Sequence, residues 1–377
     1  GTMGGGIFET VNGGITWRTI SDNMMASCMV QTEDGTIFIG TGDGRNAKDQ
    51  NGLADFNYET SFVGSGIYKL GSNEPMEGTT EWSFVNALAA YGNIVYAATD
   101  KGLFRYEENT WTAMVDTIAA QSVKVCPDGK VLATIGDEVC LFKGEECEVL
   151  STDETGKIDE TGKLPKGTTY KIIATSPSDA NYMYVAYLTK ANGTNNIYMT
   201  SDGGATWVTA YTHTAMYDIF VNRGLLDHAM VVYPNNPKKL LIGGQNVWVM
   251  KDETNTGIFR MECVSEGKGF QIAQSSGAFY YNYKYVHSGI QSIVFNPSNP
   301  NEFFVGTEGG VFKGSYSTDN GYLFEGANRY FETAENHTSV ARMFSVAYSD
   351  TENMIIGGSL DHGTINIYGD PNTNNIT

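Results

Sequence analysis

A repeated strand pattern is the feature that most constrains how this chain folds. A β-rich segment, a turn with Asp, Asn, Pro or Gly, and a second β-rich segment ending in small residues recur seven times. The copies are MVQTEDGTIFIGTG (29–42), ALAAYGNIVYAAT (87–99), VKVCPDGKVLATI (123–135), IIATSPSDANYMYVAY (172–187), MVVYPNNPKKLLIGG (230–244), IVFNPSNPNEFFVGT (293–307) and SVAYSDTENMIIGG (345–358). Alternating apolar residues rich in Val, Ile, Tyr and Phe predict two paired strands in each copy.

A third strand with an aromatic centre follows these pairs and occurs eight times. Its copies are GIFET (6–10), GIYKL (66–70), GLFRY (102–106), VCLFKG (139–144), NIYMTS (196–201), NVWVMK (246–251), GVFKGS (310–315) and GTINIY (363–368). A repeat of roughly fifty residues that forms a small antiparallel sheet is typical of a propeller blade. We therefore expect an all-β propeller of about seven, or eight, four-stranded antiparallel blades.

Residues 1–377 are predicted to form one such propeller, in which the N-terminal and C-terminal strands share a blade and so remove two sheet edges. The surplus third strand leaves two alternatives open. Either GTINIY (363–368) lies outside the ring, or the chain is an excerpt of a longer propeller. The opening GTMGGGIFET (1–10) reads as a strand already under way, which favours a boundary within a longer precursor.

Charge and composition exclude some function classes. The formal net charge is -19, which argues against nucleic-acid binding because phosphate neutralisation needs clustered Lys and Arg. No apolar run approaches the ~20 residues of a membrane span, and no signal peptide is visible. The five cysteines show no CxxC pair and no zinc-ligand spacing. They are expected to be buried thiols or to form one or two disulfides, and Cys140 and Cys147 are spaced to face each other across a hairpin.

One short motif recurs at the turns that follow third strands. It reads TVNGGITW (10–17) and TSDGGATW (200–207), with a degenerate copy STDNGYLF (317–324). The Asp is expected to accept backbone N–H bonds inside a tight turn, and the Trp to begin the next strand. Because Asn12 replaces the Asp in the first copy, a turn role fits the motif better than proton transfer. The predicted structural residues are Thr10, Asn12, Gly14, Trp17, Thr200, Asp202, Gly204, Trp207, Ser317, Asp319 and Gly321.

These motifs resemble the Asp-box S/T-x-D-x-G-x-T-W of bacterial neuraminidase repeats. Longer phrases such as YVHSGIQSIVFNPSNPNEFFVGTEGGVFK (285–313) are similar to sortilin-like Asp-box propellers of secreted and cell-surface proteins. The resemblance covers nearly the whole chain. It implies an extracellular or bacterial-surface location, of the kind reached by type IX secretion in Bacteroidetes-type bacteria. It also implies that the Asp-box hairpin joins the third and fourth strands at the blade periphery.

Related enzymes supply an alternative. The sialidase pattern implies an arginine triad, and the seven arginines here lie in no Arg-Ile-Pro motif, so that class is disfavoured. Xyloglucan-type hydrolases are similar propellers with paired carboxylates. Here Asp43, Asp100, Glu308 and Asp361 follow second strands. At these positions they are either candidates for a catalytic carboxylate pair or turn residues that cap the strand ends.

The segment 43–59 is rich in side-chain oxygens. Asp43, Asp49, Asn51 and Asp55 are a weak candidate set for Ca²⁺, although their spacing is not that of an EF-hand loop. A solvated loop with no metal and no cofactor is the favoured interpretation.

Two aromatic segments between blades, 210–226 and 270–289, are longer than a propeller needs. Their candidate ligand-binding residues are Tyr217, Asp218, Tyr280, Tyr281, Tyr283, Tyr285 and His287. Flat apolar faces with polar edges suit a protein, peptide or glycan. The favoured hypothesis is therefore a non-enzymatic binding propeller. The alternatives are a glycoside hydrolase and a structural module of a surface or secretion assembly.

Overall fold

The computed structural model is all-β, and its strands follow the predicted repeat. It describes residues 1, 6–21, 24–43, 63–152, 158–166, 170–188, 196–212, 219–220, 227–265, 285–326, 343–349, 354–359 and 363–368. All seven predicted strand pairs and all eight predicted third strands are present as strands. Within the described residues no helix is long and apolar enough to cross a membrane.

The strands form successive antiparallel sheets, which we label blades A to G in chain order. Blade A holds β3 (Ala26–Gln31), β4 (Ile37–Thr41) and β5 (Ile67–Lys69). Blade B holds β6 (Val85–Tyr91), β7 (Ile94–Thr99), β8 (Gly102–Glu107) and β9 (Thr110–Asp116). Blade C holds β10 (Ala120–Val125), β11 (Val131–Ile135), β12 (Glu138–Lys143) and β13 (Glu146–Val149).

The second half of the chain continues the pattern. Blade D holds β16 (Tyr170–Thr175), β17 (Met183–Leu188), β18 (Ile197–Thr200) and β19 (Val208–Tyr211). Blade E holds β20 (Ala229–Tyr233), β21 (Asn236–Gly243), β22 (Val247–Lys251) and β23 (Arg260–Cys263). Blade F holds β24 (Ile290–Asn296), β25 (Asn299–Thr307), β26 (Gly310–Ser317) and β27 (Gly321–Gly326). Blade G holds β28 (Met343–Ser349), β29 (Met354–Ser359) and β30 (Gly363–Tyr368).

Two short pairs lie outside the blades. β1 (Ile7–Glu9) and β2 (Arg18–Ser21) form an N-terminal hairpin. β14 (Ser151–Thr152) and β15 (Leu164–Pro165) form a parallel pair in the connection from blade C to blade D.

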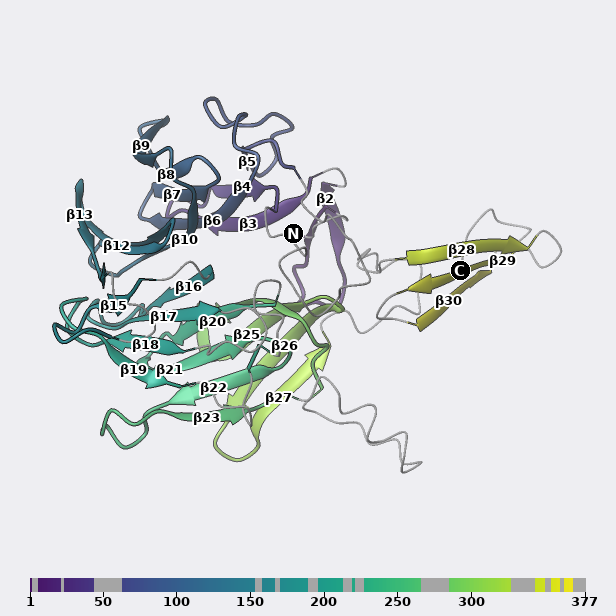
Figure 1. Cartoon of the computed structure of the whole chain (residues 1–377). Helices are drawn as coiled ribbons and strands as arrows, with labels where there is room; N and C mark the ends of the chain where they lie inside the picture. Colours follow the sequence, from purple (N-terminus) through teal and green to yellow (C-terminus); the bar gives the residue numbers. More distant parts are fainter. Residues whose placement is uncertain are drawn as a thin grey trace.

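Consecutive blades A to F are joined through their first strands, as a propeller requires. β3 lies beside β6, and the series continues through β10, β16, β20 and β24. Side chains reinforce the series near the start of these strands. Ser27 Oγ donates to the Val85 carbonyl oxygen at 2.7 Å, and Asn86 Nδ2 donates to the Ala120 carbonyl oxygen at 2.8 Å. Figure 1 shows these sheets curving around a common centre.

The predicted shared blade is not formed. β1 and β2 pair only with each other, β28–β30 form a separate sheet, and no ladder joins the two among the described strands. The hairpin instead packs on blade A, where Ile7 and Ile39 are buried together, and Figure 1 shows β28–β30 set apart from the other sheets. The surplus third strand explains this difference. β30 pairs with β29 along the same edge to which β1 would have to pair in a shared blade.

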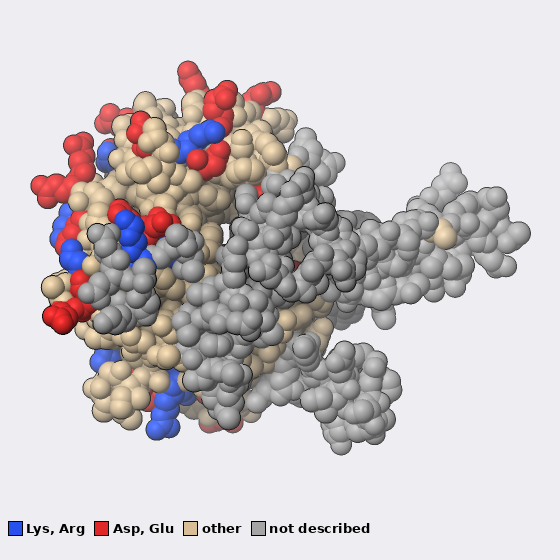
Figure 2. Space-filling model, in the orientation of Figure 1, with Lys and Arg blue, Asp and Glu red and all other residues tan. Residues whose placement is uncertain are grey.

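The core fills the spaces between blades. One buried cluster joins blade C to blade D through Leu141, Met183 and Trp207, and another joins blade E to blade F through Val249 and Phe303. A single sheet cannot cover both of its own faces, so each blade depends on its neighbours for burial. Acidic side chains lie along the outer rim in the view of Figure 2, with Lys and Arg between them, in agreement with the formal net charge of -19.

Candidate binding face

Four of the five longest connections within blades A to F begin and end at the same end of the strands. In a four-stranded meander, the turn after the second strand and the passage to the next blade share one end. Here the two meet through backbone bonds: Asp100 N donates to the Phe84 carbonyl oxygen at 3.0 Å, and Glu308 N donates to the Gly289 carbonyl oxygen at 3.0 Å. We call this end the insert face, defined by the ends of β4, β7, β11, β17, β21 and β25.

The two ends of the ring differ in the length of their connections. Segments 42–66, 150–169, 212–228 and 264–289 start and finish at the insert face, and segment 327–342 starts there. Segment 70–84, which follows the third strand of blade A, runs from the opposite end to the insert face. The longest described connections that start and finish at the opposite end are 176–182, 201–207 and 252–259. Long connections in a compact repeat are usually functional or disordered. The topology therefore concentrates the candidate functional segments on one face.

The turns of the insert face use a repeated threonine. Thr99 Oγ1 accepts hydrogen bonds from the backbone N–H groups of Lys101 and Gly102, both at 3.1 Å. Thr307 Oγ1 likewise accepts from Gly309 N at 3.1 Å, and Thr41 Oγ1 accepts from Ser65 N at 2.9 Å. These hydroxyls satisfy backbone donors that the end of a strand would leave unpaired. They hold the turns of blades A, B and F in one geometry.

Two of the predicted aromatic-segment residues are described, and both lie beside the turn of blade F. The Tyr285 side chain is 36% exposed, and its ring meets Phe312 edge-on with ring centroids 5.9 Å apart. The His287 ring covers Gly309, where any Cβ would overlap it. With Nδ1 protonated, His287 donates to the Ser288 carbonyl oxygen at 2.8 Å, which leaves Nε2 as an acceptor.

Glu308 completes this group. A Cβ at Gly289, which has a φ of +81°, would lie 2.7 Å from Glu308 Cδ, so only glycine allows the carboxyl group to pack there. We call Tyr285, His287 and Glu308 the blade F cluster. It combines an aromatic ring, an imidazole and a carboxylate on a turn fixed by Thr307. Tyr217, Asp218, Tyr280, Tyr281 and Tyr283 lie outside the described residues.

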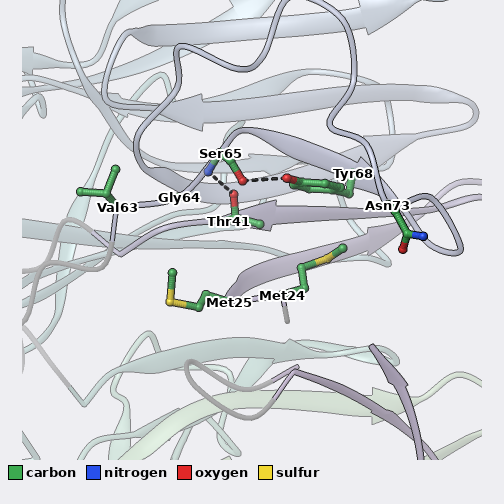
Figure 3. Close-up of a pocket in the computed structure, with 8 residues that line it drawn as sticks. All are labelled: Met24, Met25, Thr41, Val63, Gly64, Ser65, Tyr68 and Asn73. Atoms are coloured by element: carbon green, nitrogen blue, oxygen red, sulfur yellow. Dashed lines mark hydrogen bonds between the residues drawn. The ribbon is translucent and has the colours of Figure 1, made fainter. Parts of the chain in front are cut away.

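A small hollow lies at the same face on blade A. Its volume is about 150 Å³, and it is lined by Met24, Met25, Thr41, Val63, Gly64, Ser65, Tyr68 and Asn73. Figure 3 shows the two methionine side chains on one side and the Ser65–Tyr68 hydroxyl pair, 2.7 Å apart, on the other. Met residues adapt to irregular partners. These residues carry no signal in the sequence, because the Met-Met pair at 24–25 belongs to no repeated motif.

The candidate catalytic carboxylates come from different blades. Asp43 follows β4 in blade A, Asp100 follows β7 in blade B, and Glu308 follows β25 in blade F. Asp100 accepts from Phe84 N at 3.2 Å and pairs with Lys101 at 3.2 Å, so it caps the entry to β6. Asp361 lies outside the described residues. This arrangement gives Asp100 a structural role.

The calcium candidates are mostly outside the described part. Of the four, only Asp43 is described, and Asp49, Asn51 and Asp55 are not. In the part of the chain that the structure describes, no three His, Cys, Asp or Glu side chains gather as a metal site needs.

A buried cation sits at the start of blade D. Lys171 has no solvent exposure, and its Nζ lies 5.3 Å from the centroid of the Tyr187 ring. Burial lowers the pKa of Lys171 to about 8, and the nearby Asp137 carboxylate opposes that shift. An ammonium group over an aromatic face is stabilised by the ring quadrupole. Lys171 therefore stacks its ammonium group on Tyr187 within blade D, with Asp137 of blade C nearby, at a cost that depends on pH.

The second Asp-box forms a closed turn at the opposite end of blade D. Asp202 accepts from Thr206 N at 2.9 Å and from Thr206 Oγ1 at 2.6 Å, while Thr200 Oγ1 donates to it at 2.7 Å. Gly204 has a φ of +96°, a backbone conformation that this tight turn needs and that glycine adopts without strain. Trp207 is 2% exposed and packs into blade C. The motif therefore lies far along the strands from the insert face.

The first copy keeps this geometry with an amide. Asn12 Oδ1 accepts from Thr16 N at 2.9 Å, and Gly14 N donates to Thr10 Oγ1 at 2.9 Å. Trp17 immediately precedes β2. An amide oxygen serves as well as a carboxylate when its task is to accept backbone hydrogen bonds.

The third copy of the motif does not form the closed turn seen in the other two copies. β26 and β27 pair up to Ser317 and Gly321, and Asp319 accepts from Thr318 Oγ1 at 3.3 Å rather than from a backbone N–H. Leu323 stands where Thr206 stands in the second copy, so the hydroxyl that would meet the carboxylate is missing. A tight hairpin with Gly321 at positive φ replaces it.

A related turn that the sequence analysis missed occurs in blade E. Asp252 accepts from Thr256 N at 3.2 Å and Gly257 N at 2.9 Å. Its sequence, DETNTG, lacks the Trp and the double glycine of the motif. The only available signal was an Asp followed by a Thr-rich turn after a third strand.

Comparisons with known proteins identify the fold. No protein-family model matches the chain, and no curated protein matches it. A solved xyloglucanase of family GH74 from Xanthomonas campestris is similar, with a TM-score of 0.59 and 11% identity over 97% of this chain and 56% of that one. The chain has the β-propeller fold.

A second similar structure is the extracellular domain of a hybrid two-component system from B. thetaiotaomicron. The TM-score is 0.52 at 13% identity, over 92% of this chain and 38% of that one. The propeller described here therefore spans between about two fifths and three fifths of these two structures. At such identities the likeness concerns fold, and function has to be argued from the site.

Proposed function

We propose that this propeller is a secreted or cell-surface binding protein that engages a protein, peptide or glycan through its insert face. The observation that carries the proposal is the asymmetry of the ring, in which four of the five longest connections within blades A to F begin and end at one face. A rigid ring that displays variable loops on one side is a general solution for recognition. An extracellular role also agrees with the extracellular domain among the similar structures.

The blade F cluster supplies the chemistry for recognition. A half-exposed Tyr ring offers flat contact area with little loss of side-chain freedom, and the adjacent imidazole and carboxylate offer directed hydrogen bonds. The adjacent Thr307 turn holds these groups in place before a ligand arrives. Preorganisation of this kind reduces the free-energy cost of binding.

Replacing Tyr285 by Ala is expected to weaken capture of peptides or oligosaccharides at least about 10-fold, because a central aromatic contact contributes roughly 1–3 kcal/mol. Binding would be screened on peptide and oligosaccharide arrays and quantified by surface plasmon resonance. Tyr91→Ala is the matched control, since Tyr91 is 43% exposed and ends β6 at the opposite end of the ring. Equal losses for both variants, or no loss for Tyr285→Ala, would refute this assignment of the binding face.

A glycoside hydrolase is the second candidate, favoured by the repeated placement of Asp43, Asp100 and Glu308 after second strands. Catalysis would require two of these carboxyl groups about 5–10 Å apart across one cleft. Incubation with xyloglucan and assay of new reducing ends separates the candidates. Product formation that Glu308→Gln abolishes would replace the binding proposal with the hydrolase.

A further inference from the structure

Two cysteines of blade C lie together on one face of a hairpin. β12 and β13 are joined by a two-residue turn, with Cys140 opposite Val149 and Phe142 opposite Cys147. Because side chains alternate along a strand, all four of these residues point to the same side of the sheet. Cys140 and Cys147 are therefore diagonal neighbours, a pair that the twist of adjacent strands can bring together.

The two thiols are not bridged. All five cysteines are free, and Cys140 and Cys147 lie near enough for each thiol to influence the pKa of the other. Cys140 is 3% exposed and belongs to the same buried cluster as Phe142, whereas Cys147 is exposed on the outer strand. One thiol is therefore accessible to a reagent in solution, and its partner is shielded from solvent.

We propose that Cys140 and Cys147 form a dithiol modification site, which a small disulfide such as oxidised glutathione converts to an intrachain disulfide. This inference does not depend on the proposed binding function. In the first step the Cys147 thiolate attacks one sulfur of oxidised glutathione. The glutathione S–S bond breaks, and one glutathione thiolate leaves and takes up a proton.

In the second step the Cys140 thiolate attacks the Cys147 sulfur of the mixed disulfide. A second glutathione leaves, so two protein thiols lose two electrons and two protons and one oxidised glutathione becomes two reduced molecules. Burial raises the pKa of both thiols, so the thiolate fraction is small and the reaction is slow at neutral pH. Its rate increases with pH.

The diagonal position of the two cysteines also determines how easily the disulfide is reduced. Diagonal neighbours have Cα atoms roughly 7–8 Å apart, slightly beyond the usual range of a disulfide. Because β12 and β13 are already hydrogen-bonded to each other, closure has to shorten this diagonal by shifting the two strands along each other, which introduces strain. Strained disulfides are reduced more readily than structural ones, so the bridge is expected to be reversible.

Oxidation of the purified chain with glutathione disulfide, alkylation and tryptic mass spectrometry tests the proposal. Because trypsin cleaves after Lys143, the bridge appears as two linked peptides, lighter than the free pair by two hydrogen atoms. Cys140→Ser is expected to arrest Cys147 as its glutathione adduct. Exposed Cys263, which lies opposite Trp248 rather than a thiol, is the internal control and should retain its adduct in every oxidised sample before reduction.

Reduction with a small excess of glutathione should release the bridge within the same experiment. The proposal is overturned if Cys147 of the unaltered chain keeps its glutathione adduct while Cys140 stays open to alkylation after unfolding. Failure of Cys147 to react at all, under conditions that modify Cys263, overturns it equally. Melting temperatures of both serine variants in the reduced state show whether either substitution has disturbed the fold.

Discussion

Replacing Trp207 by Ala is expected to lower the free energy of unfolding by about 3–5 kcal/mol. The indole is 2% exposed and belongs to the buried cluster between blades C and D that also contains Leu141, Leu150 and Leu164. Removing it leaves a cavity that two sheets, each fixed by its own ladder, cannot readily close. Urea unfolding followed by fluorescence and circular dichroism measures the loss.

The turn that carries Trp207 provides graded controls. Asp202→Ala removes the acceptor of three hydrogen bonds and is expected to cost about 1–3 kcal/mol. Asp319→Ala, at the same motif position in blade F, removes a bond to Thr318 alone and should change stability by less than about 0.5 kcal/mol. If Asp319→Ala lowered the free energy of unfolding as much as Asp202→Ala, the distinction between the closed Asp-box turn of blade D and the plain hairpin of blade F would be wrong.

Replacing Lys171 by Met is expected to stabilise the chain at neutral pH, and the advantage should shrink as pH rises from about 8 to 10.5. Burial lowers the pKa of Lys171 to about 8 in the folded state, against 10.5 for the free side chain. Between these values the unfolded chain binds the proton and the folded chain does not. The stability of the unaltered protein therefore rises with pH in this window, by up to about 3 kcal/mol.

Urea unfolding of both proteins from pH 7 to pH 10.5 measures the difference. Lys143→Met is the control, because the Lys143 side chain is 52% exposed and pairs with Glu148 on the surface. Its effect on stability should be small and nearly constant across the window. A constant gap between Lys171→Met and the unaltered protein would show that Lys171 is not held as a desolvated cation.

Local patterns predicted the strands well. Most second strands end in small residues, such as Gly40 before Thr41 and Gly306 before Thr307, and every third strand except Gly363–Tyr368 carries a central aromatic residue. These signals depend on neighbours in sequence, and every predicted strand is present. The hairpin that places Cys140 beside Cys147 was likewise readable from spacing, although the two thiols are free.

Contacts between distant segments were harder to predict. Whether β1 or β30 occupies the edge of β29 depends on competition between two similar third strands, which a repeat pattern cannot rank. Lys239 lies 4.2 Å and 4.1 Å from the ring centroids of Tyr233 and Tyr316, an arrangement that depends on how blades E and F pack. The blade F cluster was predicted only in part, because Glu308 and His287 were assigned to different hypotheses.

Hydrogen exchange with and without a bound peptide or oligosaccharide from the arrays tests the central claim most directly. The claim is that the insert face is the binding surface of this propeller. Binding is then expected to slow exchange in 285–289 and 308–310 and to leave the turns at 32–36 and 108–109, at the opposite end, unchanged. Protection confined to those opposite turns would contradict the claim.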